Sequence, residues 1–267
     1  MSAGELKTSE PAALPRPDRR RLWWEIGIVL ALSLGQSAVY SIVAIIDLST
    51  RSKPLGDQSA SINPSQSPRE WLDATYQFLD VAFALAAVAL VIYLLWTPAV
   101  SGSRRVGLDF GRFGPDAGRG IGLVLVIGVP GIGLYVVGRL LGITVAVGAA
   151  PTHWYWWTVP ILVLSAVRAA LQEEVIVIGY LFTRLRELGW SSWTIIVGSA
   201  VLRGSYHLYQ GFGPFLGNVV MGLVFGWCYT RWKRVMPLVI AHTVIDIVSF
   251  VGYPLALLWW PGVFGAH

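Results

Sequence analysis

Residues 172–180 read QEEVIVIGY, in which two adjacent carboxylates, Glu173 and Glu174, open a run of β-branched aliphatic side chains. An apolar segment, 158–167, precedes the pair, so the pair is expected at or near the end of a membrane-spanning helix. An ionisable side chain within a bilayer costs roughly 2.5 to 3.5 kcal/mol and by default indicates a functional site with a partner. The candidate partners and counter-charges are His207, His242, Asp246, Arg168 and Arg203.

The composition indicates a protein that crosses a membrane several times. Of the 267 residues, 55% are hydrophobic and 13% are charged, and the mean hydropathy is +0.60. This excludes a soluble nucleic-acid binder despite the net charge of +5, because the basic residues fall between apolar runs rather than on one face. The single cysteine, Cys228, excludes an internal disulfide, and its apolar surroundings predict a buried, inert thiol.

We therefore predict an all-α fold, a polytopic membrane helical bundle with seven or eight transmembrane segments. The predicted segments are 26–46, 76–96, 121–143, 154–188, 193–206, 214–229 and 235–250, and the tail 253–267 forms either a short eighth segment or an interfacial helix. With a cytoplasmic N-terminus, the basic stretches 16–21, 104–119, 184–186 and 231–234 all lie on the cytoplasmic side. The expected location is the plasma membrane of a bacterium, as an integral, multi-pass protein.

His242 and Asp246 are four residues apart, so their side chains share one face of the last predicted helix. Asp246 can accept the imidazole N–H and fix the tautomer that leaves the other ring nitrogen free. A lone histidine in an apolar helix is usually a bundle residue whose hydrogen bonds are satisfied. Two histidines, an aspartate and a Glu-Glu pair in apolar segments favour a functional cluster, since each polar group needs a partner in lipid.

The predicted topology places a condition on this cluster. Glu173 and Glu174 lie toward the cytoplasmic end of the fourth segment, whereas His207 ends the fifth segment on the far side if that segment spans the membrane fully. Convergence requires that the fifth segment be short or tilted, or that the fourth segment hold its glutamates deeper in the membrane.

Three short motifs follow one another in the second half of the chain. They are Glu173-Glu174 with Gly179-Tyr180, then His207-Leu208-Tyr209-Gln210-Gly211, then Pro237-Leu238-Val239-Ile240-Ala241-His242-Thr243-Val244-Ile245-Asp246. They resemble the three motifs of the CPBP intramembrane proteases, a family that includes the type II CAAX prenyl endopeptidases and bacteriocin-processing or immunity proteins. The resemblance covers 165–251. Together with the polar, proline-containing start of the chain and its apolar runs, it predicts a disordered cytoplasmic tail (1–21), N-terminal transmembrane helices and loops (22–120), and a CPBP-like intramembrane protease domain (121–267).

Two positions depart from the family's motifs. The first motif is usually Glu-Glu-x-x-x-Arg, and here Ile178 holds the arginine position. The second is usually Phe-x-x-x-His, and here Arg203 holds the phenylalanine position. We hypothesise that Arg203 supplies, from a neighbouring helix, the positive charge that the family's arginine gives Glu174 within its own helix.

The resemblance implies an intramembrane endopeptidase that hydrolyses a peptide bond of a membrane-associated substrate, with or without a lipid group. Glu173 would be the general base that activates water, assisted by His207. His242, together with Asp246, would hydrogen-bond the developing oxyanion, and Glu174 would orient the site. The expected partners are the lipid bilayer and a membrane-associated peptide or protein, and no nucleic acid.

The same side chains admit a metal site. Glu173, His207 and His242 would form a catalytic zinc set of two imidazoles and one carboxylate with an open water position. Because the signature His-Glu-x-x-His is absent, the sequence leaves open whether a divalent metal such as zinc is bound. We favour metal-assisted or metal-compatible catalysis, and hence a metalloprotease.

Two other functions compete with peptide hydrolysis. The departures at Ile178 and Arg203 favour a catalytically drifted family member that acts as a membrane scaffold or immunity protein. A proton-coupled transporter would also use glutamates and histidines, as a proton relay. Against the transporter, the sequence lacks the repeated pair of broken helices that many transporter folds show in their two halves.

Overall fold

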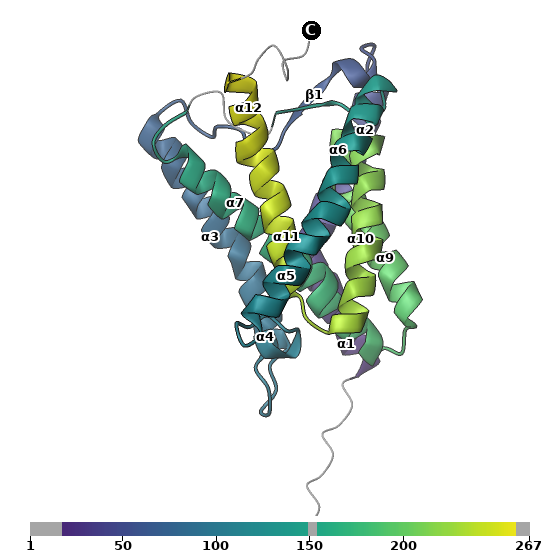
Figure 1. Cartoon of the computed structure of the whole chain (residues 1–267). Helices are drawn as coiled ribbons and strands as arrows, with labels where there is room; N and C mark the ends of the chain where they lie inside the picture. Colours follow the sequence, from purple (N-terminus) through teal and green to yellow (C-terminus); the bar gives the residue numbers. More distant parts are fainter. Residues whose placement is uncertain (1–17, 149–153, 260–267) are drawn as a thin grey trace, which may run out of the picture.

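The computed structural model describes residues 18–148 and 154–259 and is a bundle of long helices (Figure 1). Its elements are α1 (Arg19–Ala31), α2 (Leu34–Thr50), η1 (Leu55–Asp57), β1 (Ser59–Ser61), α3 (Glu70–Leu94), α4 (Gly102–Arg105), α5 (Phe113–Leu123), η2 (Val124–Gly128), α6 (Val129–Leu140), β2 (Ala146–Gly148), α7 (Thr158–Glu173), η3 (Glu174–Tyr180), α8 (Leu181–Glu187), α9 (Ser192–Ser205), η4 (Leu208–Gln210), α10 (Phe212–Trp232), α11 (Met236–Ile247), η5 (Val248–Gly252) and α12 (Tyr253–Trp259). The only regular strands among the described residues are β1 and β2, which pair in parallel with Ser59 opposite Ala146. The predicted helical membrane bundle is confirmed.

Four helical units are long and apolar enough to cross a membrane: Glu70–Leu94, Phe113–Leu140, Phe212–Trp232 and Met236–Leu255. Helices α1 and α2 add a fifth if they count as one span, although a bend of 56° separates them. Helix α9 has 14 residues, which is too few to cross a bilayer. The count of seven or eight spans stays a prediction.

Some predicted boundaries at the start of the chain were wrong. Helix α1 already begins at Arg19, inside the predicted tail 1–21, because the Asp18 carboxylate caps the helix by accepting the Arg20 backbone N–H at 3.0 Å. The predicted span 26–46 is broken before α2, where the Ser33 hydroxyl donates to the Val29 carbonyl at 2.6 Å. Residues 1–17 lie outside the described residues.

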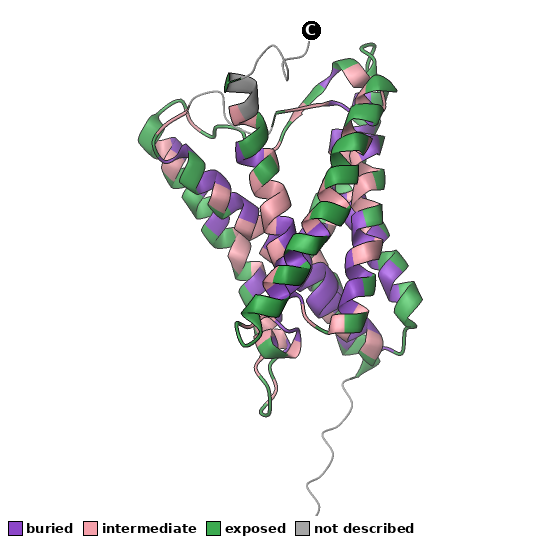
Figure 2. Ribbon diagram, in the orientation of Figure 1, coloured by how far each residue is buried: buried purple, intermediate pink, exposed green. Residues whose placement is uncertain are grey.

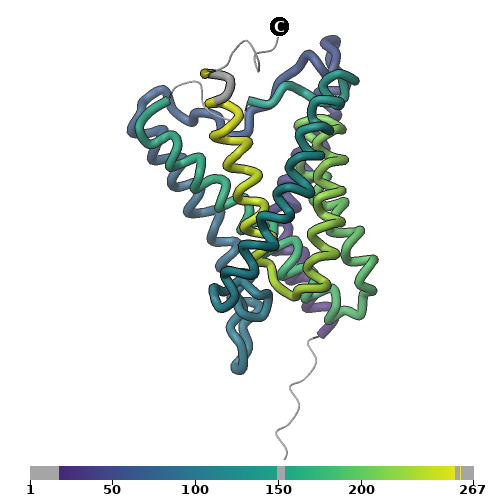
Figure 3. Tube along the Cα trace, viewed as in Figure 1, coloured from purple at the N-terminus to yellow at the C-terminus, as the bar shows by residue number. Residues whose placement is uncertain are grey.

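The boundaries of two later segments also differ from the prediction. Helix α5 begins at Phe113, within the loop that was expected before residue 121. Helix α12 continues directly from η5 to Trp259, so up to that residue there is no separate eighth segment. The tail 260–267 lies outside the described part of the chain. The described ends of the chain lie at opposite ends of the bundle (Figure 3).

The stretch quoted first in the sequence forms the centre of the bundle. All seven residues of η3 are buried, and the main hydrophobic core extends around them from Leu22 of α1 to Ala241 of α11. Cys228 belongs to this core, as predicted. Large apolar side chains also cover the outside of the bundle, where Phe83 and Leu140 are 73% and 81% exposed (Figure 2). An apolar exterior of this kind is what the hydrocarbon of a bilayer requires.

Helices α9 and α10 pack against each other through small residues. A Cβ on Gly222 would come within 2.8 Å of the Ala200 Cα atom, and one on Gly204 would come within 2.5 Å of a Val219 methyl carbon. Only glycine allows this approach of the two backbones. The close packing turns Arg203 of α9 into the interior, where it has no exposed surface.

Ion pairs tie the N-terminal helices and loops to the second half of the chain. The Arg184 guanidinium of α8 donates to Glu25 of α1 at 2.7 Å and to the carbonyl oxygen of Leu94 at 2.6 Å. Arg234, between α10 and α11, pairs with Asp109 at 3.0 Å and with Asp116 at 2.7 Å. These contacts cross the predicted domain boundary at residue 120, whose position stays a prediction.

Candidate active site

The two glutamates stand at the junction between α7, which ends at Glu173, and the π-helical turn η3, which begins at Glu174. Glu173 is 7% exposed and Glu174 is not exposed. A π-helical turn inside an α-helix is rare and often marks a functional site. Since a buried carboxylate needs hydrogen-bond donors or a counter-charge, the contacts of these two side chains define the site.

Glu174 is held by one guanidinium and one imidazole. The Arg203 Nη2 atom of α9 donates to Glu174 Oε1, and the His242 Nδ1 atom of α11 lies 2.7 Å from the same oxygen. This contact is required by the hypothesis that Arg203 supplies the positive charge of the family's missing arginine, which we call the charge-substitution hypothesis. Its consequence for activity stays a prediction.

Glu173 faces a different set of donors. The Tyr206 hydroxyl donates to Glu173 Oε2 at 2.8 Å. The same oxygen lies 3.6 Å from Arg203 Nη2 and 3.9 Å from His207 Nε2. Arg203 therefore stands against both carboxylates, whereas His207 approaches Glu173 without a direct hydrogen bond.

His207 reaches the glutamates because its helix is short. Helix α9 ends at Ser205 after 14 residues, and the chain turns back through η4 before α10 begins at Phe212. A fifth segment that spanned the membrane fully would have carried His207 to the far side. The alternative in which the fifth segment is short is therefore the one that the structure supports.

His242 lies between two carboxylates. Its Nδ1 atom contacts Glu174, and its Nε2 atom is 3.5 Å from Asp246 Oδ2. We expected Asp246 to leave the other ring nitrogen free, and this expectation was wrong because Glu174 occupies that nitrogen. With Nδ1 donating to Glu174, Nε2 can donate a hydrogen bond only when the ring carries both protons.

Several buried polar atoms of this cluster have no protein partner among the described residues. They are Glu174 Oε2, Arg203 Nε, Arg203 Nη1 and His207 Nε2. Buried polar atoms are normally satisfied, so these atoms mark where water or a polar group of a substrate can bind.

Arg168, the other candidate counter-charge, does not join the cluster. Its Nη2 atom lies 3.9 Å from Asp80 of α3, and its Nη1 atom donates to the Gln172 side chain at 3.4 Å. Arg203 is thus the cation that contacts the glutamates within the described residues.

The arrangement does not fit the predicted zinc set. Among the described residues, no three His, Cys, Asp or Glu side chains are arranged to hold a metal ion. The Arg203 guanidinium lies against both carboxylates, where a second cation would be repelled, and Glu174 engages one nitrogen of His242. Metal binding stays a prediction.

Tyr206 is the contact that the sequence reasoning missed. Its side chain is 5% exposed, and the Ser41 hydroxyl of α2 donates to its carbonyl oxygen at 2.9 Å. The N-terminal helices therefore support the site from outside the segment that carries the motifs. The available signal was its position immediately before His207, but an aromatic residue in an apolar segment is most often a core residue.

Residues 155–248 match the family model described as type II CAAX prenyl endopeptidase Rce1-like. This is a protease family, so the match confirms the resemblance drawn from the three motifs and assigns this region to a family of membrane-embedded hydrolases. It gives no support to the scaffold or the transporter alternative. No curated protein and no solved structure matches the chain.

Proposed function

We propose that the chain is an intramembrane endopeptidase that hydrolyses a peptide bond of a membrane-associated substrate, with or without a lipid group, by attack of a water molecule activated by Glu173. The observation that carries the proposal is the convergence of two glutamates, two histidines and an aspartate from three helical segments and the loop after α9 on one interior cluster. Since the family match supports a protease, this cluster is the best candidate for its active site.

Glu173 and His207 are suited to hold the attacking water. The 3.9 Å between Glu173 Oε2 and His207 Nε2 is too long for a direct hydrogen bond, so one water can contact both atoms. Glu173 takes a proton as the water oxygen bonds to the carbonyl carbon of the substrate. The same proton then passes to the amide nitrogen as the C–N bond breaks, which yields an amine and a carboxylic acid that loses its remaining proton to the amine or to water.

The second carboxylate positions the remaining groups. Glu174 binds Arg203 on one side and His242 on the other, which orients His242 toward Asp246. In the doubly protonated form, His242 Nε2 can transfer its hydrogen bond from Asp246 to the oxyanion of the substrate. Arg203 Nη2 also lies near both glutamates and compensates their charge.

The orientation in the membrane is part of the proposal. We place the N-terminus in the cytoplasm and the protein in the plasma membrane of a bacterium, because the basic stretches then face the cytoplasm. The start of α1, the short helix α4 and the C-terminal end of α10 lie at one end of the bundle, in agreement with this assignment (Figure 1).

The test is cleavage of a panel of membrane-anchored peptides, some of them prenylated, by the full chain reconstituted in lipid vesicles. Glu173→Gln keeps the shape of the side chain and removes the base, so we expect cleavage to fall by about 10²- to 10⁴-fold. Glu70→Gln, at an exposed position in the first turn of α3, is the matched control and should cleave like the wild type. Cleavage by Glu173→Gln at the wild-type rate would contradict the proposal.

A chelator added to the same assay tests the metal alternative. Because Arg203 already supplies a cation beside the glutamates, we expect cleavage to persist in a strong chelator. Loss of cleavage that added zinc restores would instead establish the metal-assisted reaction.

A further inference from the structure

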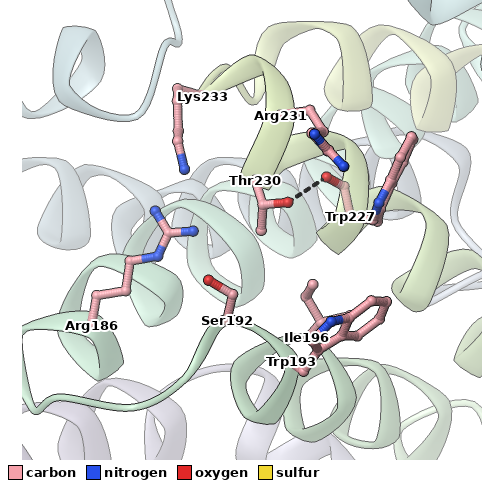
Figure 4. A pocket seen from close by; sticks show the side chains of 8 residues that line it. All are labelled: Arg186, Ser192, Trp193, Ile196, Trp227, Thr230, Arg231 and Lys233. Atoms are coloured by element: carbon pink, nitrogen blue, oxygen red, sulfur yellow. Dashed lines mark hydrogen bonds between the residues drawn. The ribbon is translucent and has the colours of Figure 1, made fainter.

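A basic cavity that shares no lining residue with the glutamate cluster opens between the ends of three helices. Its volume is about 330 Å³, and it lies between the C-terminal ends of α8 and α10 and the N-terminal end of α9 (Figure 4). The side chains that line it are Arg186, Ser192, Trp193, Ile196, Trp227, Thr230, Arg231 and Lys233. Its lining thus contains three cations, two indoles and two hydroxyl groups, but no carboxylate.

Among the residues that the structure describes, the three cations have no acidic partner. Arg186, Arg231 and Lys233 form no salt bridge with any residue in the described ranges, although other arginines at this end of the bundle do. Arg186 and Lys233 point toward each other across the cavity (Figure 4). Burial and the positive charge of Arg186 lower the pKa of Lys233, as expected for like charges brought together.

A neighbouring cavity of about 660 Å³ shows the contrast. It is lined by Arg21 and Arg184, but also by Glu25, which pairs with Arg184 at 2.7 Å. Of its two cations, Arg184 is therefore neutralised within the protein. The cations of the first cavity are available to an anion from outside.

Two more features of the first cavity favour an anion. Ser192 begins α9, a helix of 14 residues whose cap residue Ser191 accepts the Thr194 N–H at 3.2 Å, so the positive end of the helix dipole adjoins the cavity. Lys233 has φ = 55°, a left-handed conformation that is common for glycine or asparagine at a helix C-terminus but not for lysine. A residue kept in an unfavourable conformation is a reason to look for a function of its side chain.

The apolar part of the lining indicates where the ligand comes from. Trp193 is 65% exposed and Trp227 is 45% exposed, and both lie beside the cavity on the outer helices α9 and α10. Exposed tryptophans are typical of the zone where lipid headgroups meet hydrocarbon. Basic pockets between helices at that depth suit phosphate headgroups.

We propose that this cavity binds the phosphate group of one anionic membrane phospholipid, with its acyl chains along Trp193 and Trp227. Arg186 and Lys233 hold the phosphate from opposite sides, and the Ser192 hydroxyl and the N-terminus of α9 donate to its oxygens. The site would couple α8, which continues from the glutamate-bearing turn η3, to the composition of the surrounding membrane.

The test is lipid binding to the purified full chain, measured by native mass spectrometry. Phosphatidylglycerol and phosphatidylcholine with the same acyl chains are titrated separately, and inorganic phosphate is added as a competitor. We expect one phosphatidylglycerol to bind more tightly than phosphatidylcholine, and inorganic phosphate to compete only weakly because it lacks the chains. Arg186→Gln and Lys233→Asn should each weaken phosphatidylglycerol binding by about fivefold.

Two further variants control for charge and folding. Arg112→Gln removes one positive charge from an exposed residue outside the cavity and should bind like the wild type. Arg186→Lys keeps the charge and should retain most of the affinity. Equal affinity for the two lipids, or unchanged phosphatidylglycerol binding in both cavity variants, would overturn the proposal. Inorganic phosphate that displaces the lipid at equal concentration would reassign the cavity to a soluble anion and would likewise overturn it.

Discussion

The glutamate cluster and the basic cavity handle charge in opposite ways. In the interior, Glu173 and Glu174 share the guanidinium of Arg203, which has no exposed surface. At the end of the bundle, Arg186 and Lys233 face each other in a cavity with no acidic side chain from the described part of the chain. The difference follows from solvation, since an unpaired charge is far more costly in the interior than where water can reach it. A charge left unpaired near the surface is therefore open to a ligand, whereas one in the interior must be balanced by the protein.

The largest effect is expected from removal of the interior cation. Arg203→Phe restores the residue usual in the family but leaves both glutamates without their guanidinium, and removing one partner of a buried pair costs about 3 to 5 kcal/mol. We expect a lower unfolding midpoint in detergent and loss of peptide cleavage. The double variant Arg203→Phe with Ile178→Arg should keep cleavage, and equal activity of the single and double variants would refute the charge-substitution hypothesis.

A smaller effect is expected at the hydroxyl that holds the proposed base. Tyr206→Phe removes one hydrogen bond to Glu173, and hydrogen bonds to charged groups contribute about 1.5 to 3 kcal/mol. The turnover number should fall by about tenfold or more while the KM stays near the wild-type value, because Tyr206 positions Glu173 and does not bind substrate. Tyr40→Phe, at an exposed position of α2, is the matched control. An unchanged turnover number in Tyr206→Phe would contradict a positioning role of Tyr206.

A substitution in the basic cavity is expected to raise the stability of the protein rather than to lower it. Lys233→Gly relieves the left-handed backbone, which costs an L-residue roughly 1 to 2 kcal/mol, so the free energy of unfolding should rise by about 1 kcal/mol. Phosphatidylglycerol binding should fall in the same variant. Both results together would show that Lys233 lowers the stability of the protein and contributes to lipid binding. A variant that is less stable than the wild type would contradict this reading of Lys233.

The smallest effect is expected from an ion pair outside the spans. The hydrogen bond from Arg234 lowers the pKa of Asp109. A carboxylate with a lowered folded pKa adds stability above its unfolded pKa, near 3.9, and loses it as the pH falls through the folded value. Because Asp109 is partly exposed, this contribution is at most about 1 kcal/mol. Between neutral and acidic pH, the unfolding midpoint of Asp109→Asn should decline less than that of the wild type. An identical decline in both proteins would contradict a stabilising role of this ion pair.

The sequence predicted most members of the glutamate cluster, though not Tyr206, because lipid leaves few choices. Each polar side chain in an apolar segment needs a partner, so Glu174, His242 and Arg203 could be expected to meet before their helices were placed. The sequence could not predict how His242 divides its two nitrogens between Glu174 and Asp246. That division depends on the rotation of α11 about its axis, which the i, i+4 spacing of His242 and Asp246 does not determine.

Helix ends and contacts between distant residues were the parts that sequence could not supply. The sequence marks the apolar run of α9 but not the turn after Ser205 that brings His207 back to the glutamates. The break before α2 lies at Ser33, whose hydroxyl donates to the Val29 carbonyl inside an otherwise continuous apolar segment. Arg186 and Lys233 are far apart in the chain, so their meeting around one cavity required the packing of α8 against α9 and α10.

The most direct test of the central claim is a double-mutant cycle on peptide cleavage with Glu173→Gln and His207→Gln. If both side chains hold the same water, each single variant should lower kcat/KM by about 10²- to 10⁴-fold, and the double variant should be no worse than the weaker single one. Losses that simply multiply, or a His207→Gln variant with wild-type kcat/KM, would contradict a shared water between Glu173 and His207.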